Sequence, residues 1–205
     1  MTNLQHGARA TTPARAGIGP RDLSLIAVFA ALIAALTLVP AIPVGALGVP
    51  ITLQTLGVSL AALILGSLRG SASVLLYLVV GLAGIPVFAR FSGGLGVLAG
   101  PSAGYLLAFP FAALVAGALA TLVLRRTTRW RFALLFLSAM AGSILVTHPM
   151  GIVGMSINAQ IPLSQAAAYD LLYWPGDVVK NLLAAAVAVT VFKAFPRLAR
   201  RDFQR

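Results

Sequence analysis

The chain has 205 residues, of which 60% are hydrophobic and 9% are charged, and its mean hydropathy is +0.97. These values exclude a soluble globular domain, because 15 basic and four acidic side chains cannot cover the surface of a soluble fold of this length. The absence of cysteine excludes disulfides, thiolate metal sites and cysteine nucleophiles. We therefore expect an all-α integral membrane protein.

A helix that crosses roughly 30 Å of hydrocarbon needs about 20 mostly apolar residues. Runs that approach this length predict six transmembrane helices, at residues 23–40, 52–68, 71–89, 103–124, 132–153 and 175–195. We expect their ends to be right to within about two to four residues. Only Arg69-Gly70 separates the second run from the third, so a loop is predicted there.

The chain begins with residues 1–22, which contain several Arg, Gly, Pro and Thr and predict a basic cytoplasmic tail. A transmembrane domain at 23–195 and a second basic cytoplasmic tail at 196–205 follow. A basic start before apolar residues also resembles a secretory signal. An even number of helices fits the charge distribution better, so we favour a tail.

The first predicted helix carries alanine at every fourth position, at Ala27, Ala31 and Ala35. Strips of small side chains at this spacing let helices pack closely in lipid. The partner is either another helix of this chain or a separate membrane subunit.

The connection at residues 41–51 has no charged side chain and is rich in Pro and Gly. An apolar loop of this kind either covers a bound ligand as a lid or enters the lipid interface, and we favour the lid. Gln54 follows at the start of the second helix and offers a hydrogen-bonding amide near the loop.

Residues 88–105 are rich in glycine, which permits close backbone approach or a re-entrant turn. A phosphate-binding loop is excluded because the segment lacks a Gly-Lys-Ser/Thr sequence. Arg90 lies here and is a candidate partner for a substrate carboxylate. A contact with a lipid headgroup is the equal alternative.

His148-Pro149 predicts a kink and a helix-to-helix hydrogen bond in the fifth helix. A metal site is disfavoured because no second histidine or carboxylate accompanies it. Asn158, in the next connection, has an amide able to bind a ligand or to serve as an ordinary loop contact.

Asp177 and Lys180 are spaced to lie on one face of the sixth helix. Pro175 fits the first turn of that helix, where its missing N–H has no cost. A charge in a bilayer helix costs roughly 2.5 to 3.5 kcal/mol, so such a pair marks a functional site by default. An ion pair that only neutralises itself is the alternative. Tyr173 adds an aromatic wall for a flat ligand.

The basic residues other than Arg90 and Lys180 fall on one side of the membrane when alternate connections are grouped together. The positive-inside rule then places both termini in the cytoplasm. The net charge of +11 therefore reflects membrane orientation, and we expect no nucleic-acid partner.

Three segments resemble the BioY family, the biotin-specific substrate-capture (S) component of energy-coupling factor (ECF) transporters. They cover residues 49–54, 84–105 and 175–180, and the Pro-Gly-Asp-x-x-Lys sequence of the third is the most specific. The resemblance extends in the correct order over about residues 23–195.

The resemblance implies a six-helix S-component fold in the bacterial cytoplasmic membrane, with biotin captured from outside. It also implies uptake together with a transmembrane coupling subunit and two cytoplasmic ATPases. The alanine strip, Ala27, Ala31 and Ala35, is similar to the surface that docks on the coupling subunit. No catalytic residue, cofactor or metal is expected.

Biotin suits the candidate residues chemically. Its ureido group has two N–H donors and one carbonyl acceptor, which Asp177 and Lys180 can satisfy, and its carboxylate needs a cation such as Arg90. Gln54, Asn158 and Tyr173 complete the predicted substrate site.

Two other functions would use some of the same residues. A proton-coupled secondary transporter of a small carboxylate or vitamin would use Asp177 as its titrating group, but no inverted repeat supports it. An intramembrane serine hydrolase would use Ser92 and His148, but the sequence around Ser92 lacks a nucleophile motif.

Overall fold

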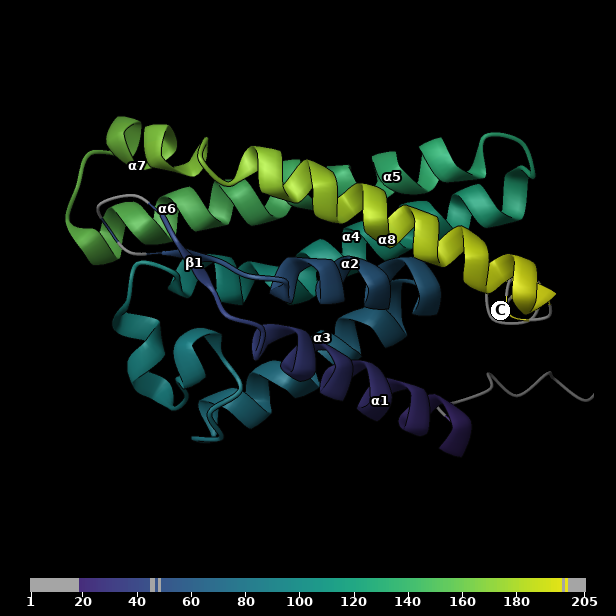
Figure 1. Ribbon diagram of the computed structural model, residues 1–205, viewed down its shortest axis with the longest axis horizontal. Coiled ribbons are helices and arrows are strands. Elements are labelled where there is room, and N and C mark those ends of the chain that lie inside the picture. The colour runs from purple at the N-terminus through teal and green to yellow at the C-terminus, as the bar shows by residue number, and fades with distance from the viewer. Residues whose placement is uncertain (1–18, 45–46, 48, 197, 199–205) are drawn as a thin grey trace, which may run out of the picture.

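The computed structural model describes residues 19–44, 47, 49–196 and 198, so most of both predicted tails lies outside the described residues. The regular secondary structure of the described residues is helical except for a hairpin of two short strands, β1 (Ile42–Pro43) and β2 (Pro50–Ile51), and one isolated bridge. Figure 1 shows the bundle formed by α1 (Pro20–Thr37), α2 (Gln54–Leu65), α3 (Ser67–Leu82), α4 (Ala103–Arg126), α5 (Arg131–Gly142), α6 (His148–Ala159), α7 (Leu163–Asp170) and α8 (Trp174–Ala194). Shorter turns are η1 (Ala89–Phe91), η2 (Leu95–Ala99) and the π-helical η3 (Ser143–Thr147).

Within the described residues, four helices are long and apolar enough to cross a membrane: α1, α4, the helical stretch at 131–159 that joins α5, η3 and α6, and α8. The other two apolar helices, α2 and α3, have 12 and 16 residues. At about 1.5 Å per residue they extend only about 18 Å and about 24 Å. The chain is therefore an all-α protein with four membrane-capable helices and two shorter apolar ones.

The predicted loop at Arg69-Gly70 is wrong, because the turn between α2 and α3 lies at Gly66. Gly66 has a φ of 80°, which glycine adopts without steric cost. Arg69 instead lies in the first turn of α3, where its Nε is 3.0 Å from Asp22 Oδ1 of α1. The boundary between these two apolar helices is therefore set by the backbone conformation of Gly66 and not by a polar residue.

Two further differences occur after α4. The predicted helix at 132–153 is interrupted by η3, directly before His148-Pro149. Because Pro149 has no N–H, the preceding turn loses a helical hydrogen bond, and a π-helical turn accommodates the loss. The short helix α7 was not predicted, because it contains several polar residues and no long apolar run.

The two ends of the bundle differ in character. The first turn of α1 and the last turn of α8 lie at one end, while the hairpin and α7 lie at the other (Figure 1). Between them α4 packs against α2, α3, α5 and α6, using a series of buried alanines. The loop-rich end therefore stands on a closely packed helical base.

The crossing of α4 and α6 brings two glycines into backbone contact. A Cβ atom at Gly154 would lie 2.5 Å from Gly104 Cα, closer than a real Cβ contact. The next residue of α4, Tyr105, packs its ring on Gly151 of α6. Glycine at these positions therefore sets the separation of two helices and the position of a tyrosine near the loop-rich end.

We predict that Gly104→Ala lowers the free energy of unfolding by about 1 to 3 kcal/mol, because the added methyl group overpacks the crossing. Gly96→Ala is the matched control, since no atom lies within 4 Å of a Cβ added there. Thermal unfolding of both purified variants in detergent measures the difference. An equal melting temperature for the two variants would contradict the prediction.

Candidate functional site

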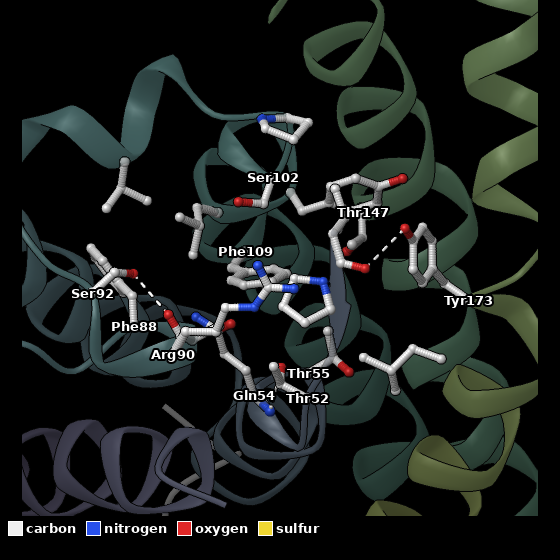
Figure 2. A pocket seen from close by; sticks show the side chains of 18 of the residues that line it. Thr52, Gln54, Thr55, Phe88, Arg90, Ser92, Ser102, Phe109, Thr147 and Tyr173 are labelled. Atoms are coloured by element: carbon white, nitrogen blue, oxygen red, sulfur yellow. Dashed lines mark hydrogen bonds between the residues drawn. The ribbon is translucent and has the colours of Figure 1, made fainter. Parts of the chain in front are cut away.

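A cavity of about 300 Å³ opens at the loop-rich end, at the small end of the range for ligand sites (Figure 2). Its walls come from the hairpin, α2, the η1–η2 segment, α4 and the start of α8. Apolar side chains such as Val49, Phe88 and Phe109 alternate with a few polar ones. The sequence-predicted residues that line the cavity are Gln54, Arg90, Tyr173, Asp177 and Lys180.

Asp177 and Lys180 form a buried ion pair in the cavity wall. Lys180 Nζ lies 2.6 Å from Asp177 Oδ1, and the two residues are 7% and 6% exposed. Thr55 Oγ1 accepts from Lys180 at 2.6 Å and donates to Asp177 at 3.1 Å. Lys180 also donates to the Thr52 carbonyl at 3.3 Å. The pair is thus fixed to α2 and still borders the cavity.

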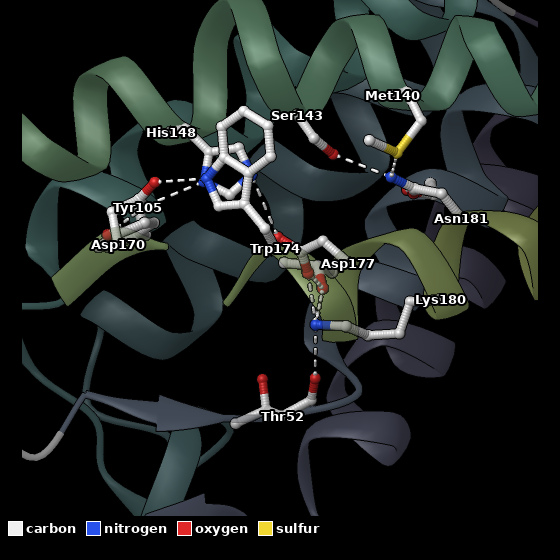
Figure 3. A network of polar contacts seen from close by, with 12 residues as sticks. Thr52, Tyr105, Met140, Ser143, His148, Asp170, Trp174, Asp177, Lys180 and Asn181 are labelled. Carbon is white, nitrogen blue, oxygen red and sulfur yellow. Dashed lines mark hydrogen bonds and ion pairs between the residues drawn. The ribbon is translucent and has the colours of Figure 1, made fainter. Parts of the chain in front are cut away.

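The second oxygen of Asp177 faces a polar network centred on His148 and Asp170, neither of which lines the cavity (Figure 3). His148 Nε2 lies 3.6 Å from Asp177 Oδ2, and His148 Nδ1 lies 2.9 Å from Asp170 Oδ1. Asp170 also accepts hydrogen bonds from Tyr105 Oη at 2.7 Å and Trp174 Nε1 at 2.8 Å. The predicted helix-to-helix contact of His148 is therefore its bond to α7.

Sequence reasoning missed Asp170, which is 1% exposed. A signal was present, since only four residues of the chain are acidic and a buried acid needs a partner. Asp170 also lies four residues before Trp174. This signal went unused because neither α7 nor the turn at 171–173, which together bring Asp170 to Trp174, was predicted.

Gln54 and Tyr173 hold the walls of the cavity. Gln54 Nε2 donates to Tyr77 Oη at 2.6 Å, which links α2 to α3. Tyr173 Oη donates to the Val49 carbonyl at 3.2 Å and so attaches the hairpin to the start of α8. The ring of Tyr173 meets that of Tyr105 edge-to-face, with centroids 5.8 Å apart. Each of these two side chains therefore makes a hydrogen bond that joins elements of the fold, and each also lines the cavity.

Arg90 extends its side chain into the cavity from η1 (Figure 2). Its φ of 60° lies in the left-handed region, as does that of Phe91 at 55°. Non-glycine residues there cost of order 1 to 3 kcal/mol, and such residues cluster at functional sites. The turn is held by Ser92 Oγ, which donates to the Ala89 carbonyl at 2.8 Å. Ser92 lines the cavity, whereas His148 does not and bonds Asp170 instead.

Asn158 lies outside the cavity lining. Its Nδ2 donates to the Leu98 and Gly100 carbonyls at 2.9 Å and 2.8 Å. The segment that it holds leads into Pro101 and Ser102, which do line the cavity. The structure therefore places Asn158 behind the wall rather than at it.

The alanine strip of α1 faces away from the bundle. Ala27, Ala31 and Ala35 are exposed, whereas Ala30 is buried against the core. Another helix of this chain therefore does not cover the strip within the described residues.

Residues 8–197 match the profile of the BioY family. The biotin transporter BioY of Rhodobacter capsulatus is 42% identical over 186 residues, covering 86% of this chain and 95% of the relative. The biotin transporter BioY of Rhizobium etli is 38% identical over 183 residues, covering 88% and 98%.

A solved structure is also similar. It is the crystal structure of the S-component for biotin from an ECF-type ABC transporter, with a TM-score of 0.79 and 29% sequence identity. The match covers 84% of this chain and 91% of that chain.

Proposed function

Because the chain belongs to the BioY family, we propose that it binds biotin in this cavity and takes part in biotin uptake as the S component of an ECF transporter. The observation that carries this proposal is a buried Asp177–Lys180 pair bordering a cavity of about 300 Å³ that also contains Arg90. The protein is a transporter component and not an enzyme.

The ion pair suits a neutral ureido ring. Asp177 accepts a ureido N–H and Lys180 donates to the ureido carbonyl, so each charged group exchanges one partner for another. An uncharged ligand with matched donors and acceptors can enter without adding net charge to the buried site. Thr55, which contacts both residues, can hold them during the exchange.

The remaining lining residues receive the rest of the ligand. Arg90 binds the carboxylate, and its position in the same cavity as Asp177 and Lys180 supports this role. The side chains of Tyr173 and Gln54 form the walls around the bicyclic ring, and they contribute polar atoms to these walls. Asn158 contributes by holding the glycine-rich wall through its two carbonyl contacts.

The chain lies in the bacterial cytoplasmic membrane with six spans, both termini in the cytoplasm and the cavity facing outward. The loop-rich end carries few basic residues, whereas Arg69 and Asp22 pair at the end where α1 begins. The shorter helices α2 and α3 complete the six spans, joined by the tight turn at Gly66.

The exposed strip Ala27, Ala31 and Ala35 docks on the transmembrane coupling subunit, which acts with two cytoplasmic ATPases. A smooth helical face lets a second helix approach closely in lipid, where close packing drives association. Its exposure supports this role.

We predict that Asp177→Asn and Lys180→Ala each weaken biotin binding by roughly 30-fold or more, because each leaves the other charge buried without its partner. Isothermal titration calorimetry of the purified protein measures the affinity. Lys193→Ala, an exposed lysine near the end of the same helix, is the control and should bind as the unmodified protein does. Unchanged affinity in both site variants would refute the assignment.

We predict that Arg90→Ala weakens the binding of biotin about tenfold or more, since a charge-assisted hydrogen bond is lost. The binding of biotin amide, which has no carboxylate, should change much less. Arg129→Ala at the opposite end of the bundle is the control. Equal losses for the two ligands would show that Arg90 does not bind the carboxylate.

We predict that Ala31→Leu disrupts assembly with the coupling subunit and leaves biotin binding intact, because the larger side chain keeps the helices apart. Co-purification of the complex measures assembly, and calorimetry measures binding. Ala186→Leu, at an exposed position of α8, is the matched control. Normal assembly of the Ala31 variant would place the docking surface elsewhere.

A further inference from the structure

His148 carries an unsatisfied buried nitrogen directly behind the proposed ureido clamp. Among the described residues, its Nε2 is the one buried side-chain nitrogen or oxygen without a hydrogen-bond partner. The residue is 2% exposed and does not line the cavity. Such an atom costs free energy unless something near it uses its hydrogen-bonding capacity. The nearest acidic atom is Asp177 Oδ2, at 3.6 Å.

The imidazole ring has little freedom to turn away. Its plane stacks on the Trp174 ring, with centroids 4.9 Å apart and an angle of 26°. Its Nδ1 bonds Asp170 Oδ1 at 2.9 Å, and Asp170 is itself fixed by Tyr105 and Trp174. The ring therefore points Nε2 at Asp177 from a rigid support (Figure 3).

The position between two carboxylates decides which form of the ring fits. A neutral imidazole has one N–H, so one of its two nitrogens would turn a lone pair toward a carboxylate. A doubly protonated ring donates toward Asp170 and Asp177 at once. The buried charges on α7 and α8 are Asp170, Asp177 and Lys180, and an imidazolium brings their sum to zero. The other titratable groups beside the network are the phenols of Tyr105 and Tyr173.

The position of His148 beside Asp177 matters when a ligand binds. In the structure the close counter-charge of Asp177 is Lys180, at 2.6 Å. When Lys180 turns to a ureido carbonyl, Asp177 loses part of that interaction while it stays buried. A cation on the far side of the carboxylate keeps it ionised and able to accept a ureido N–H.

We propose that His148, held by Asp170, is a positioning residue for biotin binding that orients Asp177 and supplies its second counter-charge. This inference rests on the proposed function, because it requires Asp177 to bind the ligand. His148 acts only through Asp177 and touches no ligand.

The test is biotin affinity in a double-mutant cycle. The full-length protein, His148→Gln, Asp177→Asn and the double variant are each titrated with biotin by calorimetry. Biotin amide is titrated in parallel, so that the ligand carboxylate does not affect the comparison. Gln165→Ala, exposed on α7, is the control.

We expect His148→Gln to bind biotin about tenfold more weakly than the unmodified protein, because Asp177 loses the group that faces its second oxygen. The double variant should bind no more weakly than Asp177→Asn alone, since coupled residues are not additive.

Additive losses in the cycle would overturn the inference. His148→Asn, which keeps a donor toward Asp170 but removes the group facing Asp177, should also bind weakly. Its binding as tightly as the unmodified protein would refute the role. Failure of the unmodified protein to bind biotin would instead refute the proposed function.

Discussion

A carboxylate and an ammonium buried in an apolar bundle must each keep a partner, and the cavity end of this protein is built around that requirement. Asp177 and Lys180 satisfy each other, and Thr55 and the Thr52 carbonyl take the remaining polar contacts. Behind them, Asp170 is enclosed by three donors. A neutral ureido ring can therefore replace contacts that the site already makes, without creating a buried unpaired charge.

Close packing and interior hydrogen bonds in the rest of the bundle keep this polar end rigid. Small side chains let helices approach closely, as at the crossing of Gly104 and Gly154. Asn181 adds a polar tie in the interior, accepting from Ser59 at 2.7 Å and donating to Ser143 at 3.0 Å. These contacts join α8 to α2 and to η3, so the helix that carries the ion pair is fixed in rotation. Rigid support of this kind keeps a ligand site organised before the ligand arrives.

The sequence predicted the parts of the structure that depend on local pattern. The long apolar runs indicated α4 and α8 closely, and helical spacing put Asp177 and Lys180 on one face. The turn at Gly66 was missed because it depends on a positive φ at this glycine, and no neighbouring polar residue marks the boundary. The contact between His148 and Asp170 joins residues 22 positions apart through a helix too short and polar to detect. That Arg90 lines the same cavity as Asp177 and Lys180 likewise needed the fold, since the sequence does not show that η1 lies beside the start of α8.

The left-handed backbone at Arg90 carries an implication for protein engineering. Glycine or asparagine would adopt the same conformation at lower cost, so a search for thermostable variants would tend to select them at this position. Such a variant would gain robustness and lose the one cation that η1 extends into the cavity. A stabilisation campaign on this protein should therefore hold position 90 constant and seek its gains at the opposite end of the bundle.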